Sequence, residues 1–150
     1  MGTLYNVNAN TGDVQIAGNV SIQGIVGKLI PIPVIPNARI NYGETKYASY
    51  AGLFDNELDA VIHLPKCRVK LLSVKARYND LSGVVAVIIR KDYLDAGYSL
   101  GIPGGSTSYW VGGCDIPYEA LQKFSIKIYA GTGGAGQYAD LSGGWIWVEI

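Results

Sequence analysis

Apolar and polar residues alternate along much of this chain with a period of two, the spacing typical of β-strands. From about residue 38 onward these runs are short, and turn residues such as Gly, Asn and Asp separate them. The pattern predicts seven strands and gives weaker signals for two more: Arg39–Tyr42, Leu58–Leu64, Arg68–Tyr78, Val84–Lys91, Tyr109–Val111, Phe124–Ala130 and Trp145–Ile150, then Tyr47–Leu53 and Gly97–Ile102. Short strands at this spacing predict an all-β fold, an antiparallel β-sandwich that is jelly-roll-like.

Three segments of the predicted sandwich show finer detail. Within Phe124–Ala130, apolar residues alternate with polar ones, which predicts an antiparallel strand with one face in water. Within Arg68–Tyr78 the apolar residues change parity, so we expect a β-bulge near residues 72–73 that keeps both sets inward. Residues 117–122 predict one helical turn, with Asp115 as its cap.

A short repeat precedes the sandwich. Residues 12–24 read GDVQIAGNVSIQG, two units of the form G-x-V-x-I-x placed back to back. Each predicted strand has only two inward residues, too few to be stable without a partner surface. A plain β-hairpin that turns at residues 17–19 and a shaft in which three chains bury these residues together both remain open. A solenoid is not favoured, because it needs at least three good coils.

Residues 29–37 read LIPIPVIPN and form a second distinct segment. Three prolines within six positions exclude a helix and a central strand, so we expect a stiff, extended arm near the polyproline II conformation. The residues between the prolines are too apolar for a free linker. The arm is therefore expected to lie in a groove, on a neighbouring subunit or on its own globular part.

These features divide the chain into an N-terminal β-repeat and proline-rich arm, residues 1–36, and a β-sandwich domain, residues 37–150. The arm serves assembly or attachment in this interpretation, because its apolar side chains need a partner surface. The expected assembly interface consists of eight residues: Val14, Ile16, Val20, Ile22, Ile30, Ile32, Val34 and Ile35.

Composition narrows the classes of function. Charged residues make up 16% of the chain, against roughly a quarter in an average protein, and 49% of residues are hydrophobic. We therefore expect copies of the chain to cover part of its surface. Twelve basic and twelve acidic residues cancel, which argues against nucleic-acid binding. No apolar run approaches the ~20 residues of a membrane span, so we expect no membrane insertion.

Few residues are candidates for chemistry. His63, the only histidine, lies in an apolar stretch without a nucleophile motif, which favours a core or interface position. The acidic residues between positions 55 and 59 lack the spacing of a calcium loop and predict a solvated loop. Cys67 and Cys114 are too far apart in sequence for a metal signature; buried free thiols are favoured, and a disulfide stays open. We expect no enzymatic activity, no metal and no cofactor.

Aromatic residues in or beside predicted loops are the candidates for ligand contact. Tyr and Trp side chains stack on sugars and also anchor protein interfaces. The candidates are Tyr98, Tyr109, Trp110 and Tyr138. Both roles remain open for this set, and subunit packing is favoured.

The succession of GDVQIAGNVSIQG, PIPVIP and a compact β-sandwich resembles the layout of trimeric virion surface proteins. These are the fibres, spikes and capsid decoration proteins of tailed phages and archaeal viruses. The resemblance covers the layout of the whole chain and no residue-level motif, so it carries over no site residues. It implies a non-enzymatic homotrimer of the virion, made in the host cytoplasm without a signal peptide, whose partners are its own copies and other virion proteins. The alternative function is a lectin-like domain that binds a host-surface glycan.

Overall fold

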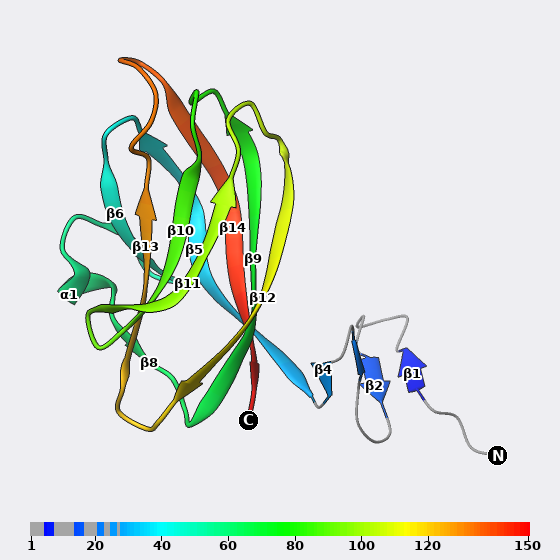
Figure 1. The fold of residues 1–150 in the computed structure, drawn as a ribbon. Helices are drawn as coiled ribbons and strands as arrows, with labels where there is room; N and C mark the ends of the chain where they lie inside the picture. The colour runs from blue at the N-terminus through cyan, green and yellow to red at the C-terminus, as the bar shows by residue number, and fades with distance from the viewer. Residues whose placement is uncertain (1–4, 8–13, 17–20, 23–24, 27) are drawn as a thin grey trace.

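The computed structural model describes residues 28–150 and, before them, residues 5–7, 14–16, 21–22 and 25–26. Two antiparallel sheets pack against each other (Figure 1). The first sheet has four strands in the order β12 (Ser108–Tyr118), β9 (Cys67–Asn79), β14 (Tyr138–Glu149) and β5 (Leu29–Asn41). The second has the order β11 (Leu94–Ile102), β10 (Val85–Lys91), β13 (Lys123–Tyr129), β6 (Thr45–Ser49) and β7 (Gly52–Phe54), with β8 (Ile62–His63) paired to β13.

The strand pairing is that of a jelly roll. Among the eight strands β5, β6 and β9 to β14, the first pairs with the last and the second with the seventh. The third pairs with the sixth, and the fourth with the fifth. A long antiparallel hairpin that folds over into two sheets has this nested pairing, which gives the double Greek key of a jelly roll. The predicted all-β fold, an antiparallel sandwich of this kind, is confirmed.

Alternate side chains of both sheets fill the space between them. On β13, Phe124, Ile126 and Ile128 are fully buried, as the alternation of this segment predicted. On β14, Ile146 is fully buried, and its two neighbours along the strand are partly exposed. Tyr118 at the end of β12 meets Phe124 edge to face, with ring centroids 5.7 Å apart. The period of two therefore decides which side chains of each strand enter the core.

The proline-rich segment belongs to the sandwich. Residues 29–36 lie in β5, which pairs with β14 along its length and forms one edge of the four-stranded sheet. Proline has no backbone N–H group to donate to a neighbouring strand. An edge strand tolerates it because no strand lies on its outer side. The segment is extended, as expected, and the groove that receives it is the edge of its own sheet. The sandwich thus begins at Leu29, whereas the sequence placed the boundary after residue 36.

Two residues of the expected assembly interface are core residues instead. Val34 and Ile35 are 0% and 3% exposed within a single copy. On β14, Gly144 and Trp145 are consecutive, but they lie opposite Ile35 and Pro33, so Val34 has no opposite residue. Because of this bulge, the consecutive residues Val34 and Ile35 both point into the core. Their assignment to a subunit interface is therefore wrong. Ile30, which is 43% exposed, and Ile32, which packs partly against the core, keep that assignment as a prediction.

The described parts of the N-terminal repeat form two small antiparallel ladders. β1 (Tyr5–Val7) pairs with β2 (Val14–Ile16), and β3 (Ser21–Ile22) pairs with β4 (Ile25–Val26). The hairpin expected to turn at residues 17–19 would pair β2 with β3, and the structure pairs them otherwise. Val20, and the side chains of Val14, Ile16 and Ile22, lie outside the described residues, so their part in assembly stays a prediction.

The predicted helical turn at residues 117–122 is wrong. β12 continues to Tyr118, and a tight turn, closed by a 3.2 Å hydrogen bond from the Gln122 N–H to the Glu119 carbonyl, leads into β13. β12 also extends well beyond the predicted Tyr109–Val111, because its long ladder with β9 stabilises residues of low strand propensity, two glycines among them.

The region of the predicted strand Leu58–Leu64 contains a short helix, α1 (Glu57–Ala60), followed by the two residues of β8. Asn56 caps the helix, since its side-chain oxygen accepts a 3.0 Å hydrogen bond from the Leu58 N–H. The β-bulge expected in β9 is present. It lies at Lys70 rather than at residues 72–73. The consecutive β14 residues Trp147 and Val148 lie opposite Leu71 and Val69, so Lys70 between them has no opposite residue.

Two truncations test where the sandwich begins. A chain that starts at Leu29 keeps the whole of β5, so we expect its unfolding temperature to match that of the full chain. A chain that starts at Asn37 loses the buried Val34 and Ile35, each worth about 1.5–3 kcal/mol of burial. We expect about 3–6 kcal/mol less unfolding free energy by urea denaturation. Equal stability of the two truncated chains would contradict this boundary.

Candidate interaction surface

The outer side of the four-stranded sheet carries a continuous row of apolar side chains. On β14, Trp145 and Trp147 alternate with core residues and therefore point outward. The register places them beside prolines of β5 and residues of β9, and places outward residues of β12 beyond these. We call this surface the aromatic face; it consists of Pro31, Pro33, Leu71, Tyr109, Val111, Trp145 and Trp147.

Hydrogen bonds and close packing fix the two tryptophans of the aromatic face. Trp147 Nε1 donates a 3.1 Å hydrogen bond to Ser73 Oγ, and Ser73 Oγ donates a 3.4 Å bond to the Trp145 carbonyl. Ser73 lies on the outer side of β9 and yet is 0% exposed. At Gly143, which has φ of +103°, an added Cβ would lie 3.1 Å from the Trp145 ring, so this ring crosses closely over the backbone. The face is therefore rigid before any partner arrives.

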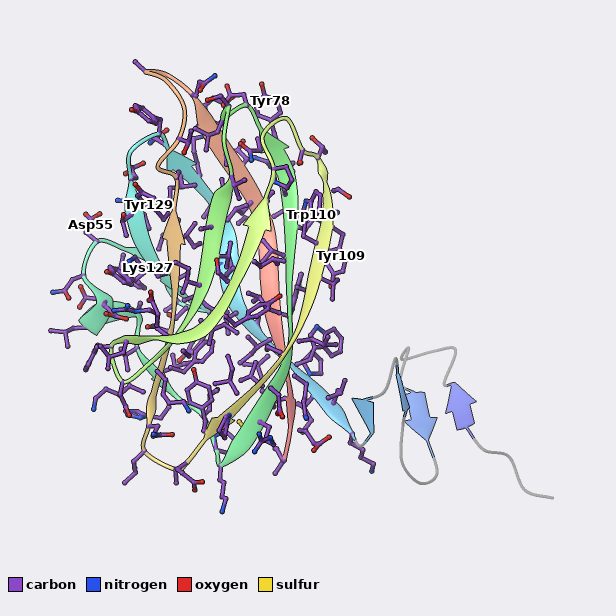
Figure 2. The ribbon with its side chains drawn as sticks, in the orientation of Figure 1. Asp55, Tyr78, Tyr109, Trp110, Lys127 and Tyr129 are labelled. Atoms are coloured by element: carbon purple, nitrogen blue, oxygen red, sulfur yellow. The ribbon has the colours of Figure 1, made fainter. Side chains whose placement is uncertain are left out.

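The β12 side of the aromatic face is open to solvent. Tyr109 and Val111 are 50% and 51% exposed, and they lie on the outer edge of the sandwich, where Figure 2 labels Tyr109. The register aligns Val111 with Ser73 and, through Ser73, with Trp145 on β14. On an ordinary protein surface, apolar residues are scattered singly. A contiguous apolar surface of this kind therefore indicates an interaction site.

Ion pairs flank the aromatic face at both ends. At one end Arg39 holds Asp140 with two bonds, Nε to Oδ1 at 2.7 Å and Nη2 to Oδ2 at 3.0 Å, and Arg77 Nη2 reaches Oδ2 at 3.2 Å. The hydrogen bond from Arg39 is the main reason that the pKa of Asp140 is lowered. The Arg39 guanidinium also lies 3.8 Å from the centroid of the Tyr138 ring. This cluster joins β5, β14 and β9 on their outer side.

At the other end the carboxylate is Asp115. Arg68 Nε lies 2.7 Å and Lys70 Nζ lies 3.1 Å from its Oδ1, and these bonds, that of Arg68 first, lower its pKa to about 2. Asp115 sits at a bulge in β12, where two residues lie opposite the single Lys70. Taken together, the charged residues of the four strands are five basic and three acidic: Arg39, Arg68, Lys70, Lys75 and Arg77 against Asp115, Asp140 and Glu149.

A second exposed surface lies at α1, on the outer side of the other sheet (Figure 1). Glu57 anchors the helix, because Arg90 Nε and Nη2 donate to its two oxygens at 2.8 and 2.9 Å and Ser125 Oγ donates at 2.9 Å. Leu58 on this helix is 65% exposed, and Tyr50, in the turn between the α1-contacting strands β6 and β7, is 66% exposed. We call this surface the α1 corner; it consists of Tyr50, Asp55, Leu58 and Asp59, all exposed.

The four aromatic candidates from the sequence do not form one site. Tyr98 and Trp110 turn toward the core, and the Tyr98 hydroxyl fills the space over Gly112, where an added Cβ would lie 1.5 Å away. Trp110 Nε1 is buried and has no hydrogen-bond partner in the described part of the chain. Tyr109 and Tyr138 are on strands that β9 separates. Only Tyr109 of the four belongs to the aromatic face.

Sequence reasoning missed the two tryptophans as surface residues. The segment Trp145–Ile150 is apolar at both parities up to Val148, so alternation alone does not say which set is inside. The signal that could have separated them is side-chain size, since the smaller Ile146 and Val148 fit the space between two sheets.

The remaining chemical candidates are in structural positions. Cys67 and Cys114 are free thiols, and burial raises the pKa of both, that of Cys114 to about 11, which keeps them protonated and weakly nucleophilic. His63 is exposed, because β8 extends only two residues along the end of β13, so the core position is wrong and the interface position stays a prediction. Among the described residues, no three His, Cys, Asp or Glu side chains are grouped to hold a metal ion. Across those same ranges, no helix has the length and apolar character needed to cross a membrane.

A hollow of about 460 Å³ opens at the end of the sandwich where β9 begins and β12 ends. Its lining is apolar at Cys67, Pro117, Tyr118 and Ile150 and also includes Lys66 and Glu119, whose Nζ and Oε2 atoms lie 3.6 Å apart. Burial is the main cause of the raised pKa of Tyr118, whose hydroxyl donates to the Arg90 carbonyl at 2.8 Å. The hollow therefore brings together no activated nucleophile and base.

Comparison with known proteins adds no family: no protein-family model matches the chain, and no curated protein matches its sequence.

The anchorage of the α1 corner can be tested by pH. Arg90 lowers the pKa of Glu57, so the stability from this pair is present above the ordinary Glu pKa of about 4.3 and is lost as pH falls through the lowered value. We expect Glu57→Gln to lower the unfolding free energy by about 1–3 kcal/mol at pH 7 and to have little effect at pH 2. Denaturant unfolding across this pH range measures both. Glu119→Gln, at an exposed position outside the α1 corner, is the control and should have little effect at either pH.

Proposed function

We propose that this protein is a non-enzymatic structural protein of a virus particle that assembles as a homotrimer, with its jelly-roll sandwich as the outward head of a fibre, spike or capsid decoration. The observation that carries the proposal is the aromatic face. It is apolar and held rigid by hydrogen bonds within the chain, and in a single copy its residues are exposed or half-buried. Jelly rolls are frequent in viral capsid proteins and in lectins, so the fold is compatible with this role, but a fold alone does not define a function.

The composition of the aromatic face favours a protein partner. Tyr and Trp are enriched in the centres of protein interfaces, where they bury much surface at little cost in side-chain entropy. Here two Trp and one Tyr lie among prolines, whose conformation is already restricted. A surface that loses so little freedom on association suits a permanent assembly.

The titratable groups with shifted pKa values favour a structural role as well. Asp115, Asp140 and Glu57 each hold strands or the α1 helix in place through arginine partners. Their lowered pKa values keep them ionised at neutral pH, where they act as acceptors in ion pairs rather than as proton donors.

Self-association can be measured by sedimentation velocity. We expect the full chain to sediment as a trimer, and Val111→Asp to shift it to monomer, because a carboxylate would be buried among the aromatic residues. Val84→Asp is the matched control: Val84 is 49% exposed, against 51% for Val111, and precedes β10 on the other sheet. A wild-type chain that stays monomeric at all concentrations would contradict the proposal.

The virion assignment needs a separate measurement. We expect peptides of this chain in purified particles from the producing cells, and antibodies against the sandwich to label the particle surface in electron micrographs. An oligomer that is absent from such particles would retain the assembly role and overturn the viral one.

Glycan binding is a second candidate, favoured by the cluster around Tyr138. The Tyr138 ring lies under Arg39 and meets the ring of Tyr78 edge to face, with centroids 5.6 Å apart. Tyr78 is 44% exposed and Tyr138 is half-buried. A tyrosine ring can stack on a sugar ring, and the neighbouring arginine can bind an acidic group of that sugar. We expect Tyr138→Ala to abolish any signal on a glycan array, and Tyr129→Ala, which changes an exposed tyrosine of the other sheet, to leave it unchanged. An array without signal for the wild type would exclude this candidate.

A further inference from the structure

We infer that copies of this chain associate head to tail, with the aromatic face of one copy packed on the α1 corner of the next. The inference rests on the proposed self-association and specifies its geometry. The partner is a second copy of this chain, and the two surfaces that meet are different ones.

The edges of the four-stranded sheet favour contact through the face. At one edge, β5 carries three prolines, at positions 31, 33 and 36, which deprive an incoming strand of N–H donors. At the other edge, β12 contains the bulge at Asp115, which disturbs the regular ladder that an added strand would require. Extension of this sheet from copy to copy is therefore disfavoured at both edges, and the outer face remains.

Charge disfavours the packing of two aromatic faces against each other. The four strands carry five basic and three acidic residues, so two identical faces would oppose two net positive charges each. Arg39 and Arg77 already share Asp140, while Lys75 is exposed beside Tyr109 in the ladder. A partner surface with an excess of carboxylates fits this face better than its own copy does.

The α1 corner provides such a surface. Residues 50–65, which include the helix, contain Asp55, Glu57 and Asp59 and no Lys or Arg, and the basic partners of Asp55 and Glu57 are Lys46 and Arg90 of neighbouring strands. Asp59 is exposed, and the described residues provide no ion pair for it. Leu58 on α1 and Tyr50, in the turn between β6 and β7, are among the most exposed large apolar residues of the described chain, and both of these strands contact α1. The exposed apolar side chains of the α1 corner lie beside acidic residues, so this corner is complementary to the aromatic face, whose strands carry an excess of basic residues.

The positions of the two surfaces permit a closed assembly. The aromatic face lies on the outer side of β5, β14, β9 and β12, and α1 lies on the outer side of the opposite sheet (Figures 1 and 2). One copy can therefore contact one neighbour through its face and another through its corner. Contacts between unlike surfaces repeat from copy to copy and form a ring when the rotation closes, as in a trimer.

Charge exchange between the two surfaces tests the inference. We expect Asp59→Lys and Lys75→Glu each to weaken self-association roughly fivefold, and the double variant to recover most of the wild-type affinity, because it restores an opposite pair across the interface. Neither residue has an ion pair to lose within the described chain, so folding should be unaffected. Losses that simply add in the double variant would overturn the inference.

Mixing of two single variants gives a second test. Leu58→Asp disrupts the α1 corner and Val111→Asp disrupts the aromatic face, so each variant alone should be monomeric. In an equimolar mixture, the intact face of the Leu58→Asp chain should bind the intact corner of the Val111→Asp chain and form a one-to-one dimer. Leu121→Asp is the control for Leu58→Asp, because Leu121 is 82% exposed at the turn between β12 and β13. A Leu58→Asp chain that still forms trimers would overturn the head-to-tail contact and leave self-association intact. A wild-type monomer would overturn both proposals.

Discussion

The pairing of β14 with both β5 and β9 is the interaction on which the rest of this structure depends. β14 is the last strand of the jelly roll, and it lies between the first strand and the third of the eight. Because side chains alternate along it, the same strand supplies Ile146 to the core and the two tryptophans to the outer surface. Its position also brings Asp140 between Arg39 and Arg77, which lie far from it in sequence.

This arrangement explains why one sheet carries the surface proposed for assembly. Ser73 of β9 accepts a hydrogen bond from one tryptophan and donates to the carbonyl of the other, so the aromatic face is held from inside the chain. The ion pairs around Asp115 and Asp140 fix the ends of the same four strands. On the opposite sheet, the pair Glu57–Arg90 fixes α1, on which Leu58 is exposed. Internal polar contacts thus leave apolar side chains at the surface on both sides.

Alternation predicted strands best where one face is buried and the other is wet. Phe124–Ala130 is such a segment, and its observed strand, Lys123–Tyr129, differs by one residue at each end. It failed at β5, because prolines within an apolar run exclude a central strand and are equally compatible with an edge strand. It also failed at α1, where a four-residue helix is too short to show a period of its own and depends on the ion pair of Glu57.

The sequence by itself determined the fold class, because the period of two and the turn residues between short runs are local properties of the chain. It also determined where a bulge was needed in β9, to within a few residues. Only the tertiary structure decided the nested pairing of the strands, the burial of Val34 and Ile35 and the outward direction of the tryptophans. Each of these depends on which strand lies beside which, and strands that are far apart along the chain carry no local mark of their partners. Long-range pairing therefore turned an ambiguous apolar pattern into one core and one exposed face.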